Sequence, residues 1–189
     1  MAKILPVFQQ LAPIDKEPFI TNVLVVISLL TQSYYSHENC CEIITYPDGF
    51  TPLWLVQKQQ KEITKLETEV FIRCIQPVKR IDLTKEEYVL IKAIIFCNPA
   101  CSNISDAGQQ LLEQECERYS KTLLRYMQSI HGGTKGASRY AQVIAVMEAM
   151  AYFAERLREF HLIRMIQRAQ EAKRQGQKSR AVYVIDDLF

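Results

Sequence analysis

The stretch of sequence that decides the fold lies at residues 2–20, and it reads Ala2-Lys3-Ile4-Leu5-Pro6-Val7-Phe8-Gln9-Gln10-Leu11-Ala12-Pro13-Ile14-Asp15-Lys16-Glu17-Pro18-Phe19-Ile20. Its spacing predicts a joint between two helices. Pro13 disfavours continuing the first helix, because proline lacks the backbone N–H that an inner helical turn requires. Asp15 is then a candidate N-cap for the second helix. Any helix–turn–helix corner of an all-α domain would also satisfy this local pattern.

Length and composition favour one domain with a sizeable core, since the chain has 189 residues of which 48% are hydrophobic. The charges are nearly balanced, at 23 basic and 21 acidic residues, so no direct nucleic-acid contact is expected. The longest apolar run, at residues 23–30, is well short of the roughly 20 residues that cross a bilayer. No membrane partner is therefore predicted, and no export either, because residues 1–11 contain Pro6 and two Gln where a signal peptide has an apolar core.

The six cysteines lack paired Cys-x-x-Cys spacing, which argues against a zinc finger or another metal site. In a chain without an export signal they are expected to be reduced thiols that pack as small hydrophobes. The chain also lacks a nucleophile motif around serine or cysteine. Its glycine-rich segment at residues 132–136 has neither a preceding strand nor the spacing of a phosphate loop. An enzyme is not predicted.

Apolar residues recur at steps of three and four over residues 15–36, which predicts a helix buried on most faces. Two β-prone runs flank Pro47-Asp48-Gly49 and predict a small hairpin. Helical patterning resumes near residue 57 and breaks near Pro77. Thr84 and Glu87 have the spacing of a capping box that opens the next helix.

Ser105 can cap the following helix, which Gly132 ends. The last long helix is predicted over residues 137–172. Residues 173–180 are polar and predict a flexible linker. The apolar segment at residues 181–189 follows it and needs a docking site.

Beyond a generic corner, the opening stretch resembles the helix 3 to helix 4 signature of nuclear hormone receptor ligand-binding domains. That signature is Ala-Lys, four residues, Phe, two residues, Leu, three residues, Asp followed by Lys or Gln, two residues, and two apolar positions. Residues 90–99 are similar to the family's helix 8 motif, and Arg139-Tyr140 stands where the family has Arg-Phe. Residues 184–189 resemble the activation helix, with Asp187 in place of Glu.

The resemblance implies an all-α ligand-binding-domain sandwich with one small hairpin, which lacks its first helices because the chain begins inside helix 3. Residues 1–189 would form this partial domain, with the linker at 173–180, the activation helix at 181–189 and no DNA-binding domain. Leu24 replaces the family's tryptophan, and Tyr35 stands where an arginine often anchors an acidic ligand. These departures indicate a divergent member, of the kind expanded in nematodes.

The resemblance also implies three groups of site residues. The coregulator groove, which would bind a Leu-x-x-Leu-Leu helix, comprises Lys3, Lys16, Ile20, Asp187 and Leu188. The ligand contacts comprise Leu24, Ser28, Gln32, Phe50, His161 and Met165. The dimer interface with a second copy or another receptor comprises Glu148, Arg156 and Arg164, beside a stripe of Tyr140, Ile144, Met147 and Ala151. The alternatives are a core stripe on that helix and a core role for His161.

The implied function is regulation of transcription by RNA polymerase II in the nucleus, through coactivator and dimer contacts. No cofactor is implied, although a small lipophilic, lipid-like ligand would fit the family. The alternative is a ligand-independent helical interaction protein that acts as a dimerisation or dominant-negative partner.

Overall fold

The computed structural model describes residues 6–58 and 62–174 of the chain. Within these ranges no strand occurs and every regular element is a helix. The elements are α1 (Pro6–Gln10), α2 (Pro13–Glu38), α3 (Pro52–Lys58), α4 (Lys65–Phe71), the 3₁₀ helix η2 (Arg73–Ile75), α5 (Gln76–Ile81), α6 (Lys85–Phe96), α7 (Asp106–His131) and α8 (Gly133–Arg174). The all-α class predicted from the sequence is therefore confirmed for the described residues.

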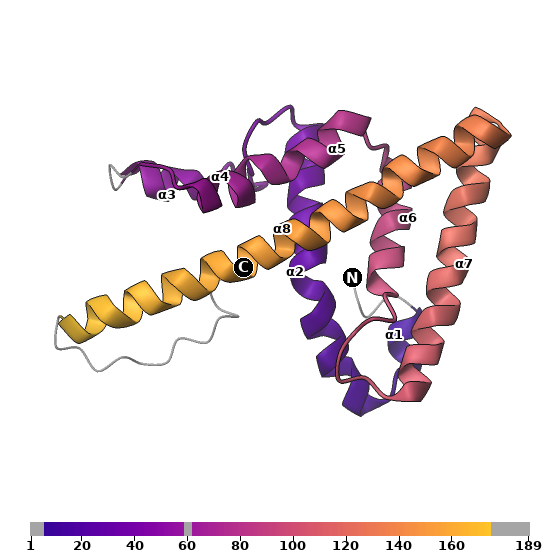
Figure 1. Cartoon of the computed structure of the whole chain (residues 1–189), viewed down its shortest axis with the longest axis horizontal. Helices are drawn as coiled ribbons and strands as arrows, with labels where there is room; N and C mark the ends of the chain where they lie inside the picture. The colour runs from indigo at the N-terminus through magenta and orange to yellow at the C-terminus, as the bar shows by residue number, and fades with distance from the viewer. Residues whose placement is uncertain (1–5, 59–61, 175–189) are drawn as a thin grey trace.

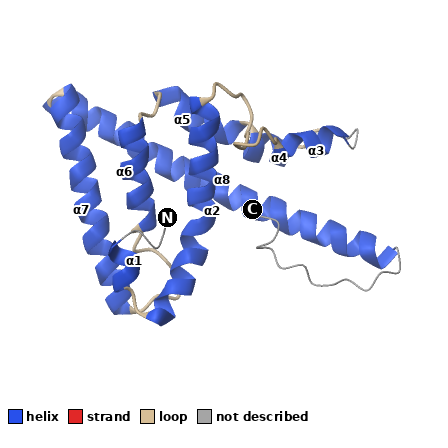
Figure 2. Ribbon diagram, turned by 180° about the vertical axis from the view of Figure 1, so that it is seen from behind, coloured by secondary structure: helices blue, strands red, loops and turns tan. Residues whose placement is uncertain are grey.

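The long helices form two layers. Figure 1 shows α8 crossing in front of α2 and α6, and Figure 2 shows α2, α6 and α7 side by side with α8 behind them. Core side chains from both layers meet at the crossing, and the fully buried ones include Leu30, Ile91, Val143 and Met150. The final turns of α8 run past this bundle (Figure 1).

Helix α2 is the central core helix. Its length and composition would also suit a membrane span, but its apolar face is covered by other helices. Phe19 and Leu30 are fully buried, and the Phe19 ring stacks on Phe96 of α6 at a centroid distance of 6.4 Å. Its N-cap is Ala12, so the prediction that Asp15 caps this helix is wrong. The buried Asp15 carboxylate instead accepts hydrogen bonds from Ser105, which lies 90 residues further along the chain.

The predicted hairpin at residues 41–55 is not formed. The turn itself exists, since the Tyr46 N–H donates to the Phe50 carbonyl at 2.9 Å and Gly49 has a φ of +82°. However, the Ile44 N–H donates to Phe71 of α4 at 2.8 Å, so it does not pair across the turn. Pro52 has no N–H for a ladder and starts α3, because proline suits the first turn of a helix. Tertiary pairing and proline chemistry thus override the β propensity of the flanking runs.

Three helix ends lie at the predicted capping residues. Thr84 and Glu87 form the predicted capping box of α6, and the Ser105 hydroxyl accepts the Gly108 N–H at the start of α7. Gly132, with a φ of +82°, ends α7. The next helix begins immediately at Gly133, four residues before the predicted start. The helix predicted from residue 57 is divided into short segments, and Pro77 lies in the first turn of α5 rather than at a break.

Candidate functional site

The first two helices meet at a partly exposed corner. The ring of Phe8 on α1 packs against Phe19 on α2, with centroids 6.0 Å apart. The Lys16 ammonium lies 5.3 Å from the Phe8 ring centroid, in cation–π range. Ile20, one turn beyond Lys16 and on the same side of α2, keeps 36% of its surface exposed. Phe8, Lys16 and Ile20 therefore form a small surface with an apolar floor and one cation, which we call the α1–α2 corner.

Asp15 fixes this corner to the rest of the domain. Its carboxylate accepts the Ser105 N–H at 2.9 Å and the Ser105 hydroxyl at 2.7 Å, although only 2% of the residue is exposed. The same Ser105 oxygen accepts the Gly108 N–H at 3.1 Å. One chain of hydrogen bonds thus joins the start of α2 to the start of α7. Sequence reasoning gave both residues capping roles and missed the bond between them.

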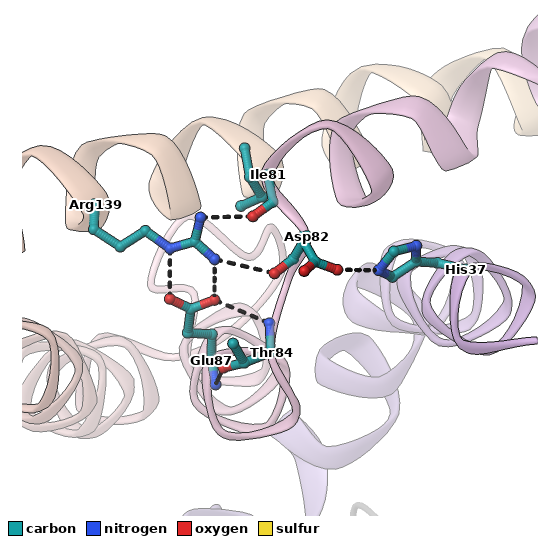
Figure 3. A network of polar contacts seen from close by, with 6 residues as sticks. All are labelled: His37, Ile81, Asp82, Thr84, Glu87 and Arg139. Carbon is teal, nitrogen blue, oxygen red and sulfur yellow. Dashed lines mark hydrogen bonds and ion pairs between the residues drawn. The ribbon is translucent and has the colours of Figure 1, made fainter. Parts of the chain in front are cut away.

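A second polar centre joins α6 to α8 near the N-terminal end of each helix (Figure 3). Arg139 of α8 donates to the backbone carbonyls of Ile81 and Asp82, at 2.6 and 3.2 Å, and to the Glu87 carboxylate. His37, at the end of α2, contacts the Asp82 carboxylate at 3.1 Å. Asp82 has a left-handed backbone with a φ of +49°, which turns the chain from α5 into α6. Three helices are therefore held together at this centre.

A buried lysine lies between α2 and α6 and was not singled out from the sequence. Lys92 is only 6% exposed, and its ammonium donates to the Tyr88 hydroxyl at 2.8 Å. That hydroxyl donates to Thr31 at 3.2 Å, and the Tyr88 ring stacks on Tyr34 with centroids 4.0 Å apart. The signal available in the sequence was the four-residue spacing of Tyr88 and Lys92 within the otherwise apolar run of residues 89–96.

The six predicted ligand contacts lie on three parts of the chain. Leu24, Ser28 and Gln32 share one side of α2, where all three are half-buried. Phe50 lies in the turn after residue 46, is 38% exposed and packs against Tyr46 with ring centroids 5.9 Å apart. His161 is half-buried on α8 beside the Phe160 ring, and Met165 is 42% exposed. The three α2 residues share one side of that helix, and all six ligand contacts remain predictions.

The predicted dimer residues lie on different sides of α8. Glu148 is exposed, whereas Arg156 and Arg164 are half-buried, and Arg156 lies 4.0 Å from Glu69 of α4. A step of eight residues turns a helix by about 80°, so these three side chains do not share one side. The accompanying stripe is mixed as well. Tyr140, Ile144 and Met147 are packed against the core, and Ala151 is exposed.

Lys3, Asp187 and Leu188 lie outside the described residues, together with the predicted activation helix at 181–189. Of the predicted linker at 173–180, the first two residues continue α8 and the remainder also falls outside the described range. The two clamp positions of the coregulator groove therefore stay predictions. Lys16 and Ile20 are the groove positions that the structure describes.

The family described as the ligand-binding domain of nuclear hormone receptor matches residues 1–166. The chain belongs to this family. The nuclear receptor ligand-binding domain identified from the opening motif is thereby confirmed. This family is not enzymatic, in agreement with the sequence interpretation.

Nematode receptors are among its relatives. The chain is 37% identical over 91 residues to the nuclear hormone receptor family member nhr-136 of Caenorhabditis elegans, covering 48% of this chain and 21% of that protein. It is 25% identical over 162 residues to the family member nhr-60 of the same organism, covering 86% of this chain and 34% of that protein. This receptor domain thus spans about a fifth to a third of the length of these curated relatives.

A solved structure has the same fold. The Ultraspiracle ligand-binding domain from Drosophila melanogaster superposes with a TM-score of 0.69 at 18% sequence identity, over 86% of this chain and 66% of that one. At this identity the likeness establishes the architecture alone. The helical sandwich expected for a nuclear receptor domain is therefore confirmed, apart from the hairpin.

Proposed function

We propose that this nuclear receptor domain regulates transcription by RNA polymerase II in the nucleus, and that it does so by binding a coregulator helix at the α1–α2 corner. Family membership supports a receptor role. The single observation that carries the site is the half-buried Lys16 ammonium over the Phe8 ring, with the exposed Ile20 one turn further along the same side of α2. A Leu-x-x-Leu-Leu helix needs an apolar floor for its leucines, and this corner supplies one.

The ends of the bound helix would be held by charge. Lys3 would donate to free carbonyls at the C-terminus of that helix, and Asp187 would accept free N–H groups at its N-terminus. Leu188 would add an apolar wall beside Ile20. Charge-assisted hydrogen bonds of this kind contribute on the order of 1.5 to 3 kcal/mol each. Losing either clamp is therefore expected to weaken binding by about tenfold or more.

A labelled Leu-x-x-Leu-Leu peptide titrated against the full chain tests this proposal. Lys3→Ala, Asp187→Ala and Ile20→Asp are each expected to weaken binding, and Asp187→Glu to hold or improve it, because the family has Glu there. Lys85→Ala is the matched control, since Lys85 is exposed on α6, away from the corner. Absence of binding by wild type, or indistinguishable curves for all variants, would remove the coregulator site.

A small lipophilic ligand is proposed beside the half-buried side of α2 that carries Leu24, Ser28 and Gln32. Phe50, His161 and Met165 are the further proposed contacts. Intact mass spectrometry of gently purified protein tests for a co-purifying lipid. Its presence, lost in Ser28→Trp, supports the ligand. Its absence favours a ligand-independent helical interaction protein that acts as a dimerisation or dominant-negative partner.

Dimerisation, with a second copy or another receptor, is proposed through residues 140–164 of α8. The exposure of Glu148 and Ala151 supports this, because Ala151 belongs to the stripe with Tyr140, Ile144 and Met147, and Glu148 lies beside Met147. Arg156 and Arg164 would flank that contact. Ala151→Glu is expected to convert an associated species to monomer in sedimentation velocity, whereas Gln167→Glu, exposed further along α8, should not. Unchanged sedimentation of Ala151→Glu would place the interface elsewhere.

A further inference from the structure

Lys92 of α6 is a buried cation that the proposed coregulator and dimer contacts do not use. It is 6% exposed, and α6 lies beside α2 (Figure 2). Its ammonium donates to the Tyr88 hydroxyl at 2.8 Å and lies 5.1 Å from the centroid of that ring. Removing an ammonium from water is costly unless an opposite charge compensates it.

The hydrogen bonds around Lys92 leave part of its ammonium unsatisfied. The Tyr88 hydroxyl accepts from Lys92 and donates to the Thr31 hydroxyl at 3.2 Å, and the Thr31 hydroxyl donates to the Ile27 carbonyl at 2.7 Å. Both hydroxyls have therefore used their single donor. An ammonium has three donors and Lys92 uses one, so its other N–H groups have no acceptor among the described residues.

The same ammonium lacks a counter-charge. Lys92 takes part in none of the ion pairs found within residues 6–58 and 62–174. The Tyr88 ring attracts the cation but carries no net charge. Water can accept the free N–H groups without neutralising the ammonium. An acceptor with a negative charge is therefore the chemistry that this position favours.

The chain of hydrogen bonds reaches the side of α2 that carries proposed ligand contacts. Leu24, Ser28, Thr31 and Tyr35 recur at steps of four, three and four, so they share one side of the helix, and all four are half-buried. Tyr35 stands where the family often has an arginine that anchors an acidic ligand, so that position carries no cation. Lys92 places a cation two hydrogen bonds away from Thr31.

Aromatic stacking holds this arrangement in place. The Tyr88 ring lies on the Tyr34 ring with centroids 4.0 Å apart and an interplanar angle of 6°. Tyr34 is only 8% exposed, so the pair is packed between the two helices. The hydroxyl that accepts from Lys92 is therefore fixed, and little further ordering is needed when a ligand binds.

We infer that Lys92 anchors the acidic head group of the ligand, and that this ligand is a monocarboxylic acid whose apolar chain lies along Leu24 and Ser28. The inference rests on the lipophilic ligand proposed above and names its chemical class. The two carboxylate oxygens would accept the unused N–H groups of Lys92. A partner helix, about 10–12 Å across, is poorly suited to reach an ammonium that lies between two packed helices. A single hydrocarbon chain that ends in its charge is narrower.

Two probes that differ only in their head group test this assignment. They are cis-parinaric acid, a fluorescent fatty acid, and the alcohol of the same chain. Wild type is expected to bind the acid at least about tenfold more tightly, because charge-assisted hydrogen bonds are stronger than neutral ones. Lys92→Met should abolish this preference and leave binding of the alcohol unchanged. Lys85→Met is the matched control, since Lys85 is exposed at the start of α6 and the preference should persist there.

Thermal unfolding without ligand separates an anchor from a structural lysine. Lys92→Met removes a buried cation that has no counter-charge, so the unfolding midpoint should stay the same or rise. A lowered midpoint together with an unchanged preference for the acid would make Lys92 structural. Lys92→Gln keeps hydrogen-bond donors without the charge. It serves as the second variant if Lys92→Met does not fold, and it should also reduce the preference for the acid.

The outcomes distinguish this inference from the proposed ligand itself. Equal binding of acid and alcohol by wild type would overturn the acidic class and leave a lipophilic ligand in place. A preference for the acid that persists in both Lys92 variants would assign the anchor to another cation. If neither probe binds, the inference and the proposed ligand both fail, while the coregulator peptide still tests the rest of the proposed function.

Discussion

Arg139 holds both carboxylate oxygens of Glu87, with its Nε 2.7 Å from Oε1 and its Nη2 2.6 Å from Oε2. The pair joins α8 to α6 across 52 residues of sequence, and only 18 and 2% of the two side chains are exposed. The planar guanidinium matches the two oxygens, which gives the contact a fixed geometry. Such a pair costs desolvation energy to form, yet it becomes strongly destabilising when one partner is lost.

Arg139→Met is therefore expected to lower the free energy of unfolding by about 3–5 kcal/mol, because it leaves the Glu87 carboxylate buried and unpaired. Arg139→Lys keeps the charge but loses the two-pronged contact, so its effect should be smaller. Urea denaturation measures both. Arg118→Met is the control, since Arg118 pairs with Glu115 at the surface and such pairs contribute about 0–1 kcal/mol. Similar losses for Arg139→Met and Arg118→Met would contradict the structural role of the buried pair.

The same pair predicts a dependence of stability on pH. Burial acts to raise the pKa of Glu87, but the hydrogen bonds from Arg139 and Thr84 outweigh it and lower that pKa below its ordinary value of 4.5. A lowered folded-state pKa stabilises the protein above the unfolded-state value. That stability is lost as the pH falls below 4.5 and through the folded-state pKa. Denaturation midpoints measured from neutral to acid pH should fall more steeply for wild type than for Glu87→Gln.

The contributions of Asp15 and Ser105 to the free energy of unfolding are expected to be coupled. Asp15→Ala should destabilise the domain by about 1–3 kcal/mol, because it leaves the part-buried N–H and hydroxyl of Ser105 without their acceptor. Ser105→Ala should cost about 1 kcal/mol or more, since it also removes the cap of α7. The double variant should lose less than the sum, with a coupling of about 0.5–3 kcal/mol. Strict additivity in this double-mutant cycle would mean that the bond contributes nothing.

Gly108 is expected to tolerate no side chain. A Cβ built there would lie 2.6 Å from Cγ2 of Ile104 and 2.8 Å from the Asp15 carboxylate, which is needed in place by Ser105. Gly108→Ala should therefore cost about 1–3 kcal/mol in thermal or urea unfolding. Gly133→Ala is the matched control. Its Cβ would meet no atom within 4 Å, so it should be neutral or stabilising by about 0.4–1 kcal/mol. A neutral Gly108→Ala would show that the first turn of α7 and the Asp15 carboxylate move apart freely.

The thiols should divide into two reactivity classes. Burial raises the pKa of Cys74 and of Cys97 to about 12, so both remain protonated near neutral pH. Cys40 is exposed and has a left-handed backbone with a φ of 55°. Because the thiolate is the reactive form, a disulfide reagent at pH 8 should modify Cys40 rapidly and Cys74 and Cys97 only after unfolding. Mass mapping of the modified peptides distinguishes them. Rapid labelling of Cys74 in the native protein would contradict this assignment.

Local sequence determined three of the helix ends that the structure describes. Thr84 with Glu87, Ser105 with Gly108, and Gly132 act over three residues or fewer, and their geometry follows from the helical backbone itself. The opening motif likewise identified the receptor family, because its residues are fixed by one corner between consecutive helices. Short-range spacing carries this information without reference to any distant segment.

Sequence failed where a local preference competed with a distant partner. The run around Ile44 has β propensity, yet its N–H pairs with Phe71 of α4, and Pro52 supplies no ladder donor. Asp15 has the chemistry of an N-cap, but the Ser105 N–H and hydroxyl offer it two donors in a buried site. A residue with several possible partners takes the one that the packed core brings within reach.

The sequence by itself determined the family, the helical class, three helix ends and the corner that carries Lys16 and Ile20. Tertiary structure alone decided which polar groups meet across the fold, as Arg139 with Glu87, and which side chains of α8 are left exposed. The physical reason is the same for both. Periodicity reveals that a helix has an apolar side, but only packing determines whether another element covers it, as at Met150, or leaves it in solvent, as at Leu162.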